Sequence, residues 1–521
     1  MDTRLSVEFL GGVADGINLT GACTSITVRR GKETTKILVD VGLVQCSFNK
    51  SGKVNRAILE SLDPKKVDYV ILTHPHIDHV GRLPLLVKYG FGDKGRVICT
   101  EATGALLPIM LKDSAIIQIS EARWRKKRLA KKEKPTKPQR GRDSRTLGSY
   151  DRTERKRKSS VKRIICEPLY SVENAQQACD LVKNGGYEYG CWIKLTKTVS
   201  LKFYPSGHVL GGAICVLRIE TDSAPIYLGF SGDLGREDGI ILPPPELPIE
   251  PINYWFIEST YGGETHPLRE DEIDELFEIV RKAKKDKRKI IIPSFALERT
   301  QEIIYLLSDA MWKGIIPKVP IFLDSPMATK LTAHFAEKWG NGMFTDQGAL
   351  SFNPFDPKEN PFFKTIMKPE DSAALVNAEG PYIVIAGSGM CDAGRVRNHL
   401  RHGLENPDTI VCIIGYMAGN SLGRKLKDGL PIVRMNGHDI VVKAEINNFG
   451  SFSAHADSPF LTSFTKSVVG SNPENSKGIF IVHGEGMGAA LLKAELMKTL
   501  PCEDWLRKII IPRLREEKIL H

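Results

Sequence analysis

Short apolar runs rich in β-branched residues recur along the chain, and each ends at a polar or glycine-containing turn. Runs of about four to eight residues with this composition are typical of buried strands. They are TKILVDVG, DYVILTHPH, PIYLGFSGD, YWFIEST, KIIIPSF, PIFLDSP, YIVIAGSG, TIVCIIGY and GIFIVHGE. Amphipathic helical patterns separate several of them, for example DEIDELFEIVRKAKK, RTQEIIYLLSDAMWK and AALLKAELMKTL. This alternation predicts an α/β protein with layered sheets.

The composition is that of a soluble globular chain. Its 521 residues, 41% hydrophobic and 26% charged, suffice for more than one domain. We expect neither a secretion signal nor a membrane span, because the first residues lack a basic segment followed by an apolar stretch and no run of 18 apolar residues occurs. The ten cysteines are scattered without a CxxC pair, so we expect reduced core residues in a cytoplasmic protein.

The formal net charge of +11 is concentrated in one segment. Residues 123–163, the basic insert, hold 19 Lys or Arg against 4 Asp or Glu, which leaves the rest of the chain slightly acidic. From about Arg123 to Ser160 the insert lacks hydrophobic periodicity and contains prolines and glycines, so we expect it to be mobile or ordered by a partner. Such a charge indicates either a polyanionic partner or a solubilising tail.

Four potential metal ligands fall within six residues directly after the run DYVIL. They are His74, His76, Asp78 and His79 in the segment THPHIDHVG. A tight loop can splay alternate side chains to two sides, so His74 and His76 can bind one ion while Asp78 and His79 bind a neighbouring one. Two later loops, YPSGH and FSGD, offer His208 and Asp233. Taken singly, each of these is more often an ordinary loop residue.

In this order the motifs resemble the metallo-β-lactamase superfamily, whose HxHxDH loop is followed by a single ligand His and then by a metal-bridging Asp. The resemblance implies that His208 and Asp233 fill those places. It also implies that Asp40, in ILVDVG, is the strand-end carboxylate that orients the metal ligands by hydrogen bonding.

The chain then continues with a second set of motifs, which resemble the β-CASP group of that superfamily. In order they are WFIESTYG, IPSFALERTQEI, LDSPMA, AGSGMCDAGRV, GYMAGNSLGRKL, SFSAHAD and IVHGE. The group includes the endonuclease subunit of eukaryotic messenger-RNA 3′ cleavage and its bacterial and archaeal relatives. The resemblance implies a four-layered αββα domain formed by residues 1–262 and 451–521, with an α/β β-CASP domain, residues 263–450, inserted between them.

By the same resemblance, Glu258, His455 and His483 fall on the group's three late motifs. His483 would complete the second metal's ligands, and His455, oriented by Glu258, would be the general acid. A histidine at position 483 favours RNA over DNA, because DNA-repair members typically carry an apolar residue there. The alternative for Glu258 and His455 is an ordinary buried polar pair.

The chemistry implied is hydrolysis of phosphodiester bonds. Two divalent ions roughly 3.5–4 Å apart can activate a water and offset phosphate charge. The resemblance implies four catalytic residues, which are Asp40, Asp78, Glu258 and His455. It implies that Asp233 bridges the two metal ions. Zinc is the default metal for this imidazole-rich set, with manganese as the alternative.

A glycine-rich segment after the run YIVI is a candidate phosphate contact. Its backbone N–H groups could hold a substrate phosphate, so we expect Ser388, Gly389, Arg395 and His399 to bind substrate. A plain strand-end turn is the alternative. Ser294 and Arg299, in SFALER, are weaker candidates of the same kind.

We therefore expect a zinc-dependent ribonuclease, an endonuclease that could also act as a 5′–3′ exonuclease. The alternative is a catalytically silent RNA-binding scaffold, which the complete ligand set disfavours. The basic insert could bind structured RNA or another protein. A homodimer is left open.

Overall fold

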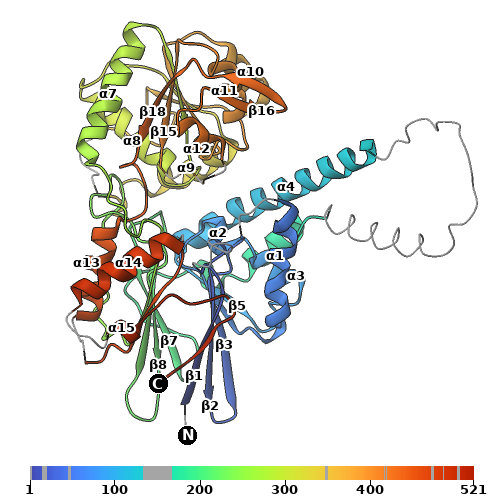
Figure 1. Ribbon diagram of the computed structural model, residues 1–521, viewed down its shortest axis with the longest axis vertical. Coiled ribbons are helices and arrows are strands. Elements are labelled where there is room, and N and C mark those ends of the chain that lie inside the picture. Colours follow the sequence, from blue (N-terminus) through green and yellow to red (C-terminus); the bar gives the residue numbers. More distant parts are fainter. Residues whose placement is uncertain are drawn as a thin grey trace, which may run out of the picture.

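The computed structural model describes residues 3–13, 20–44, 48–132, 167–345, 350–415, 417, 419, 421–470, 474–484, 486–500 and 505–521. They form two α/β bodies, one above the other in Figure 1. The chain builds most of the lower body, passes into the upper body, and returns to complete the lower one.

Two sheets make the centre of the lower body. The first has the strand order β21 (Glu517–Leu520), β1 (Thr3–Gly11), β2 (Cys23–Arg30), β3 (Glu33–Val39), β4 (Tyr69–Ile71), β5 (Arg96–Ile98). The second has the order β20 (Ile509–Ile510), β19 (Gly478–Ile481), β10 (Tyr254–Ile257), β9 (Ile226–Phe230), β8 (Ala213–Ile219), β7 (Val199–Pro205), β6 (Ile193–Lys194).

Alternate side chains of these strands form the core between the two sheets. Three aromatic rings join β9, β10 and β19 there: Phe230 and Phe256 stack at 4.2 Å, and Phe256 and Phe480 at 4.8 Å. Because the faces that point away from this core are also apolar, each sheet needs a covering layer of helices.

Helices cover both outer faces of the lower body. On the first sheet they are α1 (Phe48–Ser61), α2 (Ile77–Val80), α3 (Leu83–Lys88), α4 (Glu101–Lys132) and α6 (Val172–Asp180). On the second sheet they are α13 (Ser458–Gly470), α14 (Gly486–Thr499) and α15 (Trp505–Lys508). The lower body is thus a four-layered αββα sandwich, which confirms the predicted fold class.

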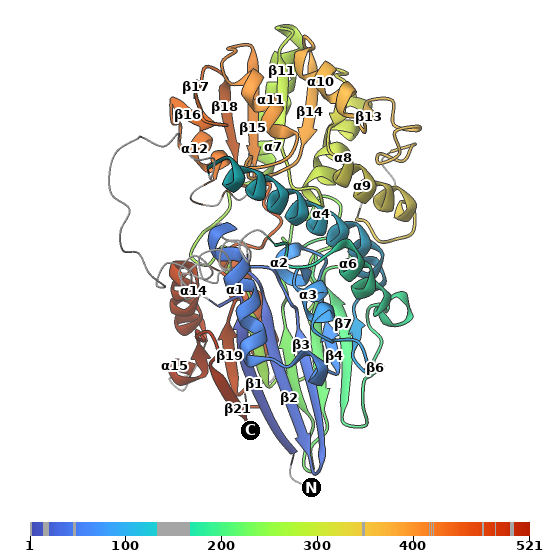
Figure 2. The ribbon, with the colours of Figure 1, turned by 90° about the vertical axis from the view of Figure 1, so that its right-hand side faces the viewer.

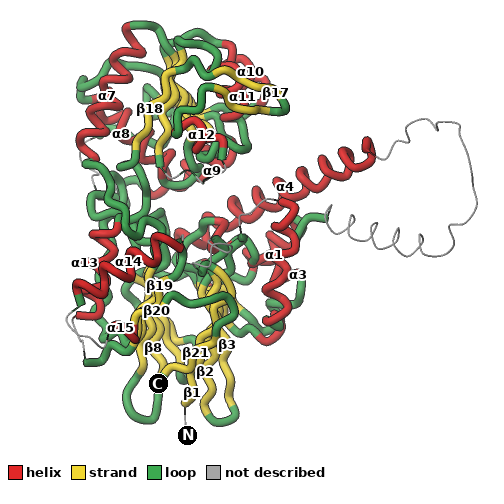
Figure 3. The backbone as a smooth tube through the Cα atoms, in the orientation of Figure 1, coloured by secondary structure: helices red, strands yellow, loops and turns green. Residues whose placement is uncertain are grey.

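The upper body is a parallel sheet with helices on both faces, visible as yellow strands between red helices in Figure 3. Its strand order is β13 (Phe363–Thr365), β12 (Ile321–Leu323), β14 (Tyr382–Ala386), β11 (Lys289–Pro293), β15 (Thr409–Ile414), β18 (Glu445–Phe449). One face packs on α7 (Arg269–Lys285), α8 (Arg299–Trp312) and α9 (Pro326–Lys338). The other packs on α10 (Pro369–Asn377), α11 (Val396–Gly403) and α12 (Leu422–Lys427). Strands β16 (Ile432–Met435) and β17 (His438–Val441) form an antiparallel hairpin between α12 and β18 in the chain.

The expected domain boundaries fall in connecting segments. Residue 262 lies between β10 and α7, and residue 450 lies between β18 and α13. Seven cysteines lie in the described residues and all are free, whereas Cys46, Cys166 and Cys502 lie outside them.

Helix α4 runs along the junction of the two bodies, and its C-terminal part projects from the molecule (Figures 1 and 2). It continues to Lys132, so the first ten residues of the segment that we expected to be mobile or ordered by a partner belong to this helix. Lysine and arginine are good helix formers, and extending an existing helix is far easier than starting one. The remainder of the insert, residues 133–163, lies outside the described residues.

By length and composition alone, Glu101–Lys127 of α4 could also cross a membrane, although much of its most apolar part is buried in the protein. Core helices of soluble proteins meet the same criterion. Here Ala102, Leu106 and Met110 pack into the core that the two bodies share. We therefore read α4 as a packed helix.

Candidate active site

The HxHxDH segment lies directly after β4 and turns into the short helix α2. His76 precedes this helix, so that Asp78 and His79 lie in its single turn. The loop packs tightly against the segment after β3: a Cβ on Gly42 would fall 1.4 Å from the Asp78 carbonyl oxygen. A glycine is therefore required at position 42 for this loop to lie where it does.

Asp40 directly follows β3 and holds the HxHxDH loop by hydrogen bonds. Its Oδ1 accepts a hydrogen bond from Thr73 N at 2.9 Å, and its Oδ2 accepts one from Thr73 Oγ1 at 2.8 Å. Its Oδ2 also lies 2.8 Å from His79 Nδ1. Because a carboxylate accepts, His79 carries a proton on Nδ1 and directs its Nε2 inward. Asp40 itself has a φ of 58°, a conformation found mainly where the surroundings impose it.

One group of four buried or half-buried donors comes from three loops. It consists of His74, His76, His208 and Asp233, whose donor atoms all lie within 4.8 Å of one another. His76 Nδ1 is 3.1 Å from His74 Nε2 and 3.3 Å from His208 Nε2. Asp233 Oδ2 is 3.5 Å from His74 Nε2 and 3.6 Å from His208 Nε2.

A second group, Asp78, His79 and His483, lies beside the first. His79 Nε2 is 3.2 Å from His483 Nε2, which is 3.5 Å from Asp78 Oδ2. The two groups share Asp233: its second oxygen, Oδ1, lies 3.3 Å from His79 Nε2 and 3.4 Å from His483 Nδ1. One carboxylate thus faces both groups, as a bridging ligand would.

The chemistry of the donor set fits two divalent cations. Tetrahedral ligands at about 2.0–2.1 Å from a zinc ion lie about 3.3 Å apart, which is close to the spacing found here. His208 Nδ1 lies 3.3 Å from the Ala454 carbonyl oxygen, so its Nε2 also presents a lone pair to the cluster. Among the described residues, the buried Asp233 Oδ1 has no hydrogen-bond partner. Facing lone pairs and an unsatisfied buried carboxylate oxygen are what a bound cation relieves.

Burial and charge keep the histidines of the first group neutral, which is the form that binds a metal. Burial and the neighbouring imidazoles hold the pKa of His74 and of His208 well below the usual value, and burial lowers the pKa of His76 to about 4. Burial of Asp233 acts to raise the pKa of its carboxyl, but the surrounding histidines outweigh it and hold that pKa well below its usual range. The first group is therefore a set of neutral imidazoles beside an ionised carboxylate, the state that binds a metal. In the second group burial opposes protonation, but Asp233 and the other neighbouring carboxylates outweigh it and raise the pKa of His79 and of His483, so a metal that binds there displaces protons.

A His–carboxylate pair lies next to the first group. His455 Nδ1 is 3.2 Å from both oxygens of Glu258, and the His455 ring lies 4.4 Å from that of His208. Glu258 is fully buried, and its Oε1 accepts a hydrogen bond from Leu234 N at 2.6 Å. Burial of His455 opposes protonation, but the Glu258 carboxylate outweighs it and the pKa of His455 rises to about 8. The carboxylate thus holds a protonated His455 beside the metal cluster.

The glycine-rich segment after β14 is arranged differently. Arg395 Nη1 donates to Asp324 Oδ1 at 2.7 Å, and His399 Nε2 lies 2.7 Å from Asp324 Oδ2. Ser372 Oγ donates to the same Oδ2 at 2.6 Å, and Arg395 also donates to two backbone carbonyls. Asp324, at the end of β12, is therefore the fully buried centre of this cluster. The structure joins Arg395 and His399 to it rather than to the metal ligands.

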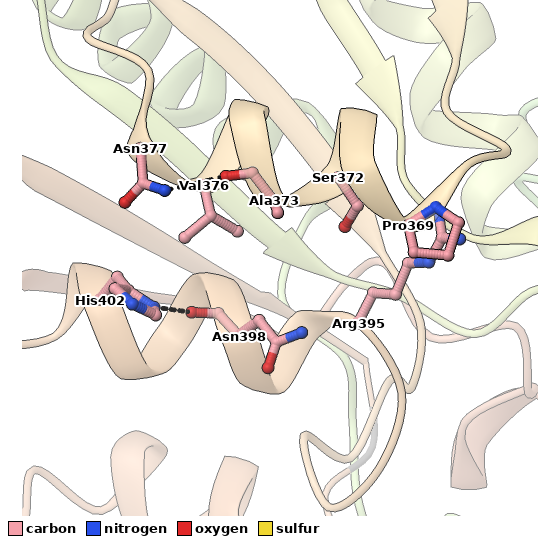
Figure 4. Close-up of a pocket in the computed structure, with 8 residues that line it drawn as sticks. All are labelled: Pro369, Ser372, Ala373, Val376, Asn377, Arg395, Asn398 and His402. Carbon is pink, nitrogen blue, oxygen red and sulfur yellow. Dashed lines mark hydrogen bonds between the residues drawn. The ribbon is translucent and has the colours of Figure 1, made fainter.

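Arg395 also borders a cavity of about 280 Å³ between α10 and α11 (Figure 4). Ser388 is half-buried, and Gly389 lies against the Phe295 ring, where a Cβ would come within 2.7 Å. Contact of Ser388, Gly389, Arg395 and His399 with phosphate stays a prediction. Ser294 and Arg299 are buried: Ser294 Oγ accepts from Thr300 Oγ1 at 3.0 Å, and Arg299 pairs with Glu302.

Several supporting residues were not predicted. Thr73 directly precedes the first ligand, a position that could have drawn attention to it. Asp324 lies in the motif LDSPMA, but its partners are more than 45 residues away along the chain, so no local pattern points to it. Thr260, whose Oγ1 is 3.3 Å from His483 Nδ1, is equally remote in sequence.

The two facing sheets, with a shared carboxylate between two donor groups at their strand ends, define a hydrolase-type site for two divalent metals. Three family models match the chain: the metallo-beta-lactamase superfamily over residues 20–97, the Beta-Casp domain over 300–426, and the Zn-dependent metallo-hydrolase RNA specificity domain over 439–501. The last segment contains His455 and His483.

Curated relatives match along most of the chain. It is 31% identical to ribonuclease TTHA0252 of Thermus thermophilus over 86% of this chain and 88% of the relative. It is 27% identical to transcription termination factor FttA of Methanocaldococcus jannaschii, covering 93% of this chain and 67% of the relative. It is 25% identical to an RNase J-like protein of the same archaeon, over 94% and 96%. The chain belongs to the β-CASP group of the metallo-β-lactamase superfamily, and it binds divalent metal.

Proposed function

We propose that this protein is a zinc-dependent ribonuclease, which hydrolyses phosphodiester bonds within RNA and also degrades RNA from a 5′ end. The observation that supports it most is the protonated His455 held by Glu258 beside the Asp233-centred metal cluster. The relatives named as ribonucleases make RNA the substrate of choice. We place its action in the cytoplasm.

His74, His76, His208 and Asp233 would hold one metal, and Asp78, His79 and His483 the other, with Asp233 shared. When bound, two divalent ions supply an activated water and offset the charge of the phosphate. Zinc is the proposed metal, because imidazoles outnumber carboxylates among the donors, and manganese is the alternative.

The chain's own residues supply the remaining parts of the reaction. Asp40 fixes His79 in the tautomer that binds metal. His455 is placed to give a proton to the departing sugar oxygen, because its raised pKa keeps it protonated near neutral pH. Glu258 accepts from His455 Nδ1, and its charge favours the doubly protonated ring, so the proton on Nε2 is the one available to the leaving oxygen.

The basic insert, residues 123–163, is proposed to hold structured RNA through its phosphates. Its cationic side chains would make binding strongly dependent on salt. A protein partner for the insert and a homodimer are alternatives, which the mass of the purified protein with and without RNA would reveal.

Cleavage of a 5′-labelled structured RNA tests the function. We expect the zinc-loaded protein to cut it, a chelator to stop cutting, and added zinc to restore it. Asp78→Ala should be inactive, with Asp113→Ala as a matched control in α4. Internal fragments would indicate endonuclease action and mononucleotides exonuclease action. RNA that is bound but never cut by the zinc-loaded or the manganese-loaded protein would overturn the proposal in favour of a scaffold.

A further inference from the structure

Glu298 has a backbone conformation that side chains rarely adopt. It lies between β11 and α8 in the upper body, with φ 71° and ψ −63°. Its side chain is 2% exposed and does not cap the helix that follows it. A glycine would fit this backbone without strain. We therefore look to the contacts of its side chain to explain why a large, buried glutamate occupies this position.

The side chain crosses to the lower body and meets the loop that carries His208. Glu298 Oε2 accepts a hydrogen bond from Leu210 N at 3.0 Å. Two other amides of the loop find acceptors within the lower body: Gly212 N donates to Val209 O at 2.7 Å, and Ser206 N to Gly212 O at 3.1 Å. Leu210 is buried, and a buried amide without a partner is strongly unfavourable.

Both bodies contact the loop at other points as well. Gly211 O accepts hydrogen bonds from Thr100 Oγ1 and Thr103 Oγ1, and the His208 ring faces the Ala454 carbonyl oxygen. The side chains of Val209 and Leu210 pack into the core shared with the upper body. The segment just after the metal ligand is therefore shaped by the inserted domain.

We propose that Glu298 is a positioning residue, through which the inserted domain holds the His208 loop in the shape that binds metal. The proposal rests on the metal site of the proposed function. It assigns to the upper body a part in building the metal centre itself, in addition to any contact with RNA. The backbone strain at Glu298 is retained because the acceptor is needed at this place.

The role needs an acceptor oxygen, not a negative charge. Burial raises the pKa of Glu298 to about 8, so near neutral pH the carboxyl is largely protonated, and its carbonyl oxygen can still accept from Leu210 N. Glu298→Gln keeps that oxygen at the same reach. Glu298→Gly relieves the backbone and removes the acceptor, and Glu298→Asn tolerates the backbone but is too short to reach.

The test measures zinc affinity of the full-length protein by competition with a chelator, together with the melting temperature of the zinc-free protein. Lys287→Gly is the matched control, because Lys287 also has a positive φ, of 55°, but is exposed in the turn between α7 and β11. We expect Glu298→Gln and Lys287→Gly to bind zinc within about twofold of wild type. Glu298→Gly and Glu298→Asn should bind at least one zinc about tenfold or more weakly, while each zinc-free variant still melts in one cooperative transition.

Wild-type zinc affinity in Glu298→Gly or Glu298→Asn would overturn the proposal. So would equal loss of affinity in Glu298→Gln, because that would exclude the acceptor as the cause. These readouts involve no RNA. A wild-type protein that binds zinc but does not cut RNA would refute the proposed function and leave this inference standing.

Discussion

The loop after β4 and the segment after β14 look alike in sequence and differ in the structure. Both follow mostly buried strands, and both strands are followed by histidines with acidic or basic neighbours. In the first, imidazole nitrogens and Asp233 crowd together at 3.1–3.6 Å, with lone pairs facing one another. In the second, Arg395 and His399 meet the opposite charge of Asp324.

The difference shows what distinguishes a metal site from a structural cluster at a strand end. Side chains whose lone pairs face one another need a cation between them. N–H groups that face a carboxylate already have their hydrogen-bond partner. The acceptor at the second site comes from another strand, 71 residues before Arg395. The first cluster should therefore control activity and metal content, and the second should control stability.

The largest effect is expected from Asp233→Ala. The substitution removes the oxygen atoms that face both donor groups, so we expect cleavage to fall at least about a thousandfold and bound metal to be lost. Metal content measured by mass spectrometry, beside RNA cleavage, checks this. Full metal occupancy in the inactive variant would mean that Asp233 does not hold the pair together.

Asp324→Ala is the matched change in the second cluster. It leaves the Arg395 guanidinium without its carboxylate in a buried setting, so we expect the free energy of unfolding to fall by about 3 kcal/mol. Cleavage under folding conditions should stay within about threefold of wild type, and metal content should not change. Chemical denaturation gives the first quantity. If cleavage is lost while stability is kept, the second cluster contacts substrate after all.

A smaller effect is expected from Glu258→Gln, read from the pH dependence of cleavage. In the wild type, His455 must be protonated to act, so the rate should fall as pH rises through about 8, or somewhat lower once two cations are bound nearby. Removing the Glu258 charge lowers the pKa of His455, which moves this falling limb to lower pH. We expect about a tenfold loss at pH 8 and less at pH 6. An unchanged falling limb would show that His455 is not the group that titrates.

Sequence reasoning succeeded where the chemistry is local. Four ligands within six residues after an apolar run indicate a metal loop, and short β-branched runs between amphipathic helices indicate layered α/β sheets. It failed where the deciding partner is remote. Asp324 and Glu298 act on residues 71 and 88 positions away, and no periodicity encodes such pairs. The helical residues Arg123–Lys132 were missed because their stability comes from extending α4, not from an apolar face of their own.

The most direct test of the account compares two substrates in the His455→Ala protein loaded with zinc. RNA needs a proton on its departing oxygen, whereas bis-(p-nitrophenyl) phosphate releases a phenolate that is stable without one. We predict that His455→Ala cuts RNA about a hundredfold or more slowly than wild type but hydrolyses the activated diester within about fivefold of it, with zinc content unchanged. Equal losses on both substrates would contradict the assignment of His455 as the general acid and leave it as a structural neighbour of the metal site.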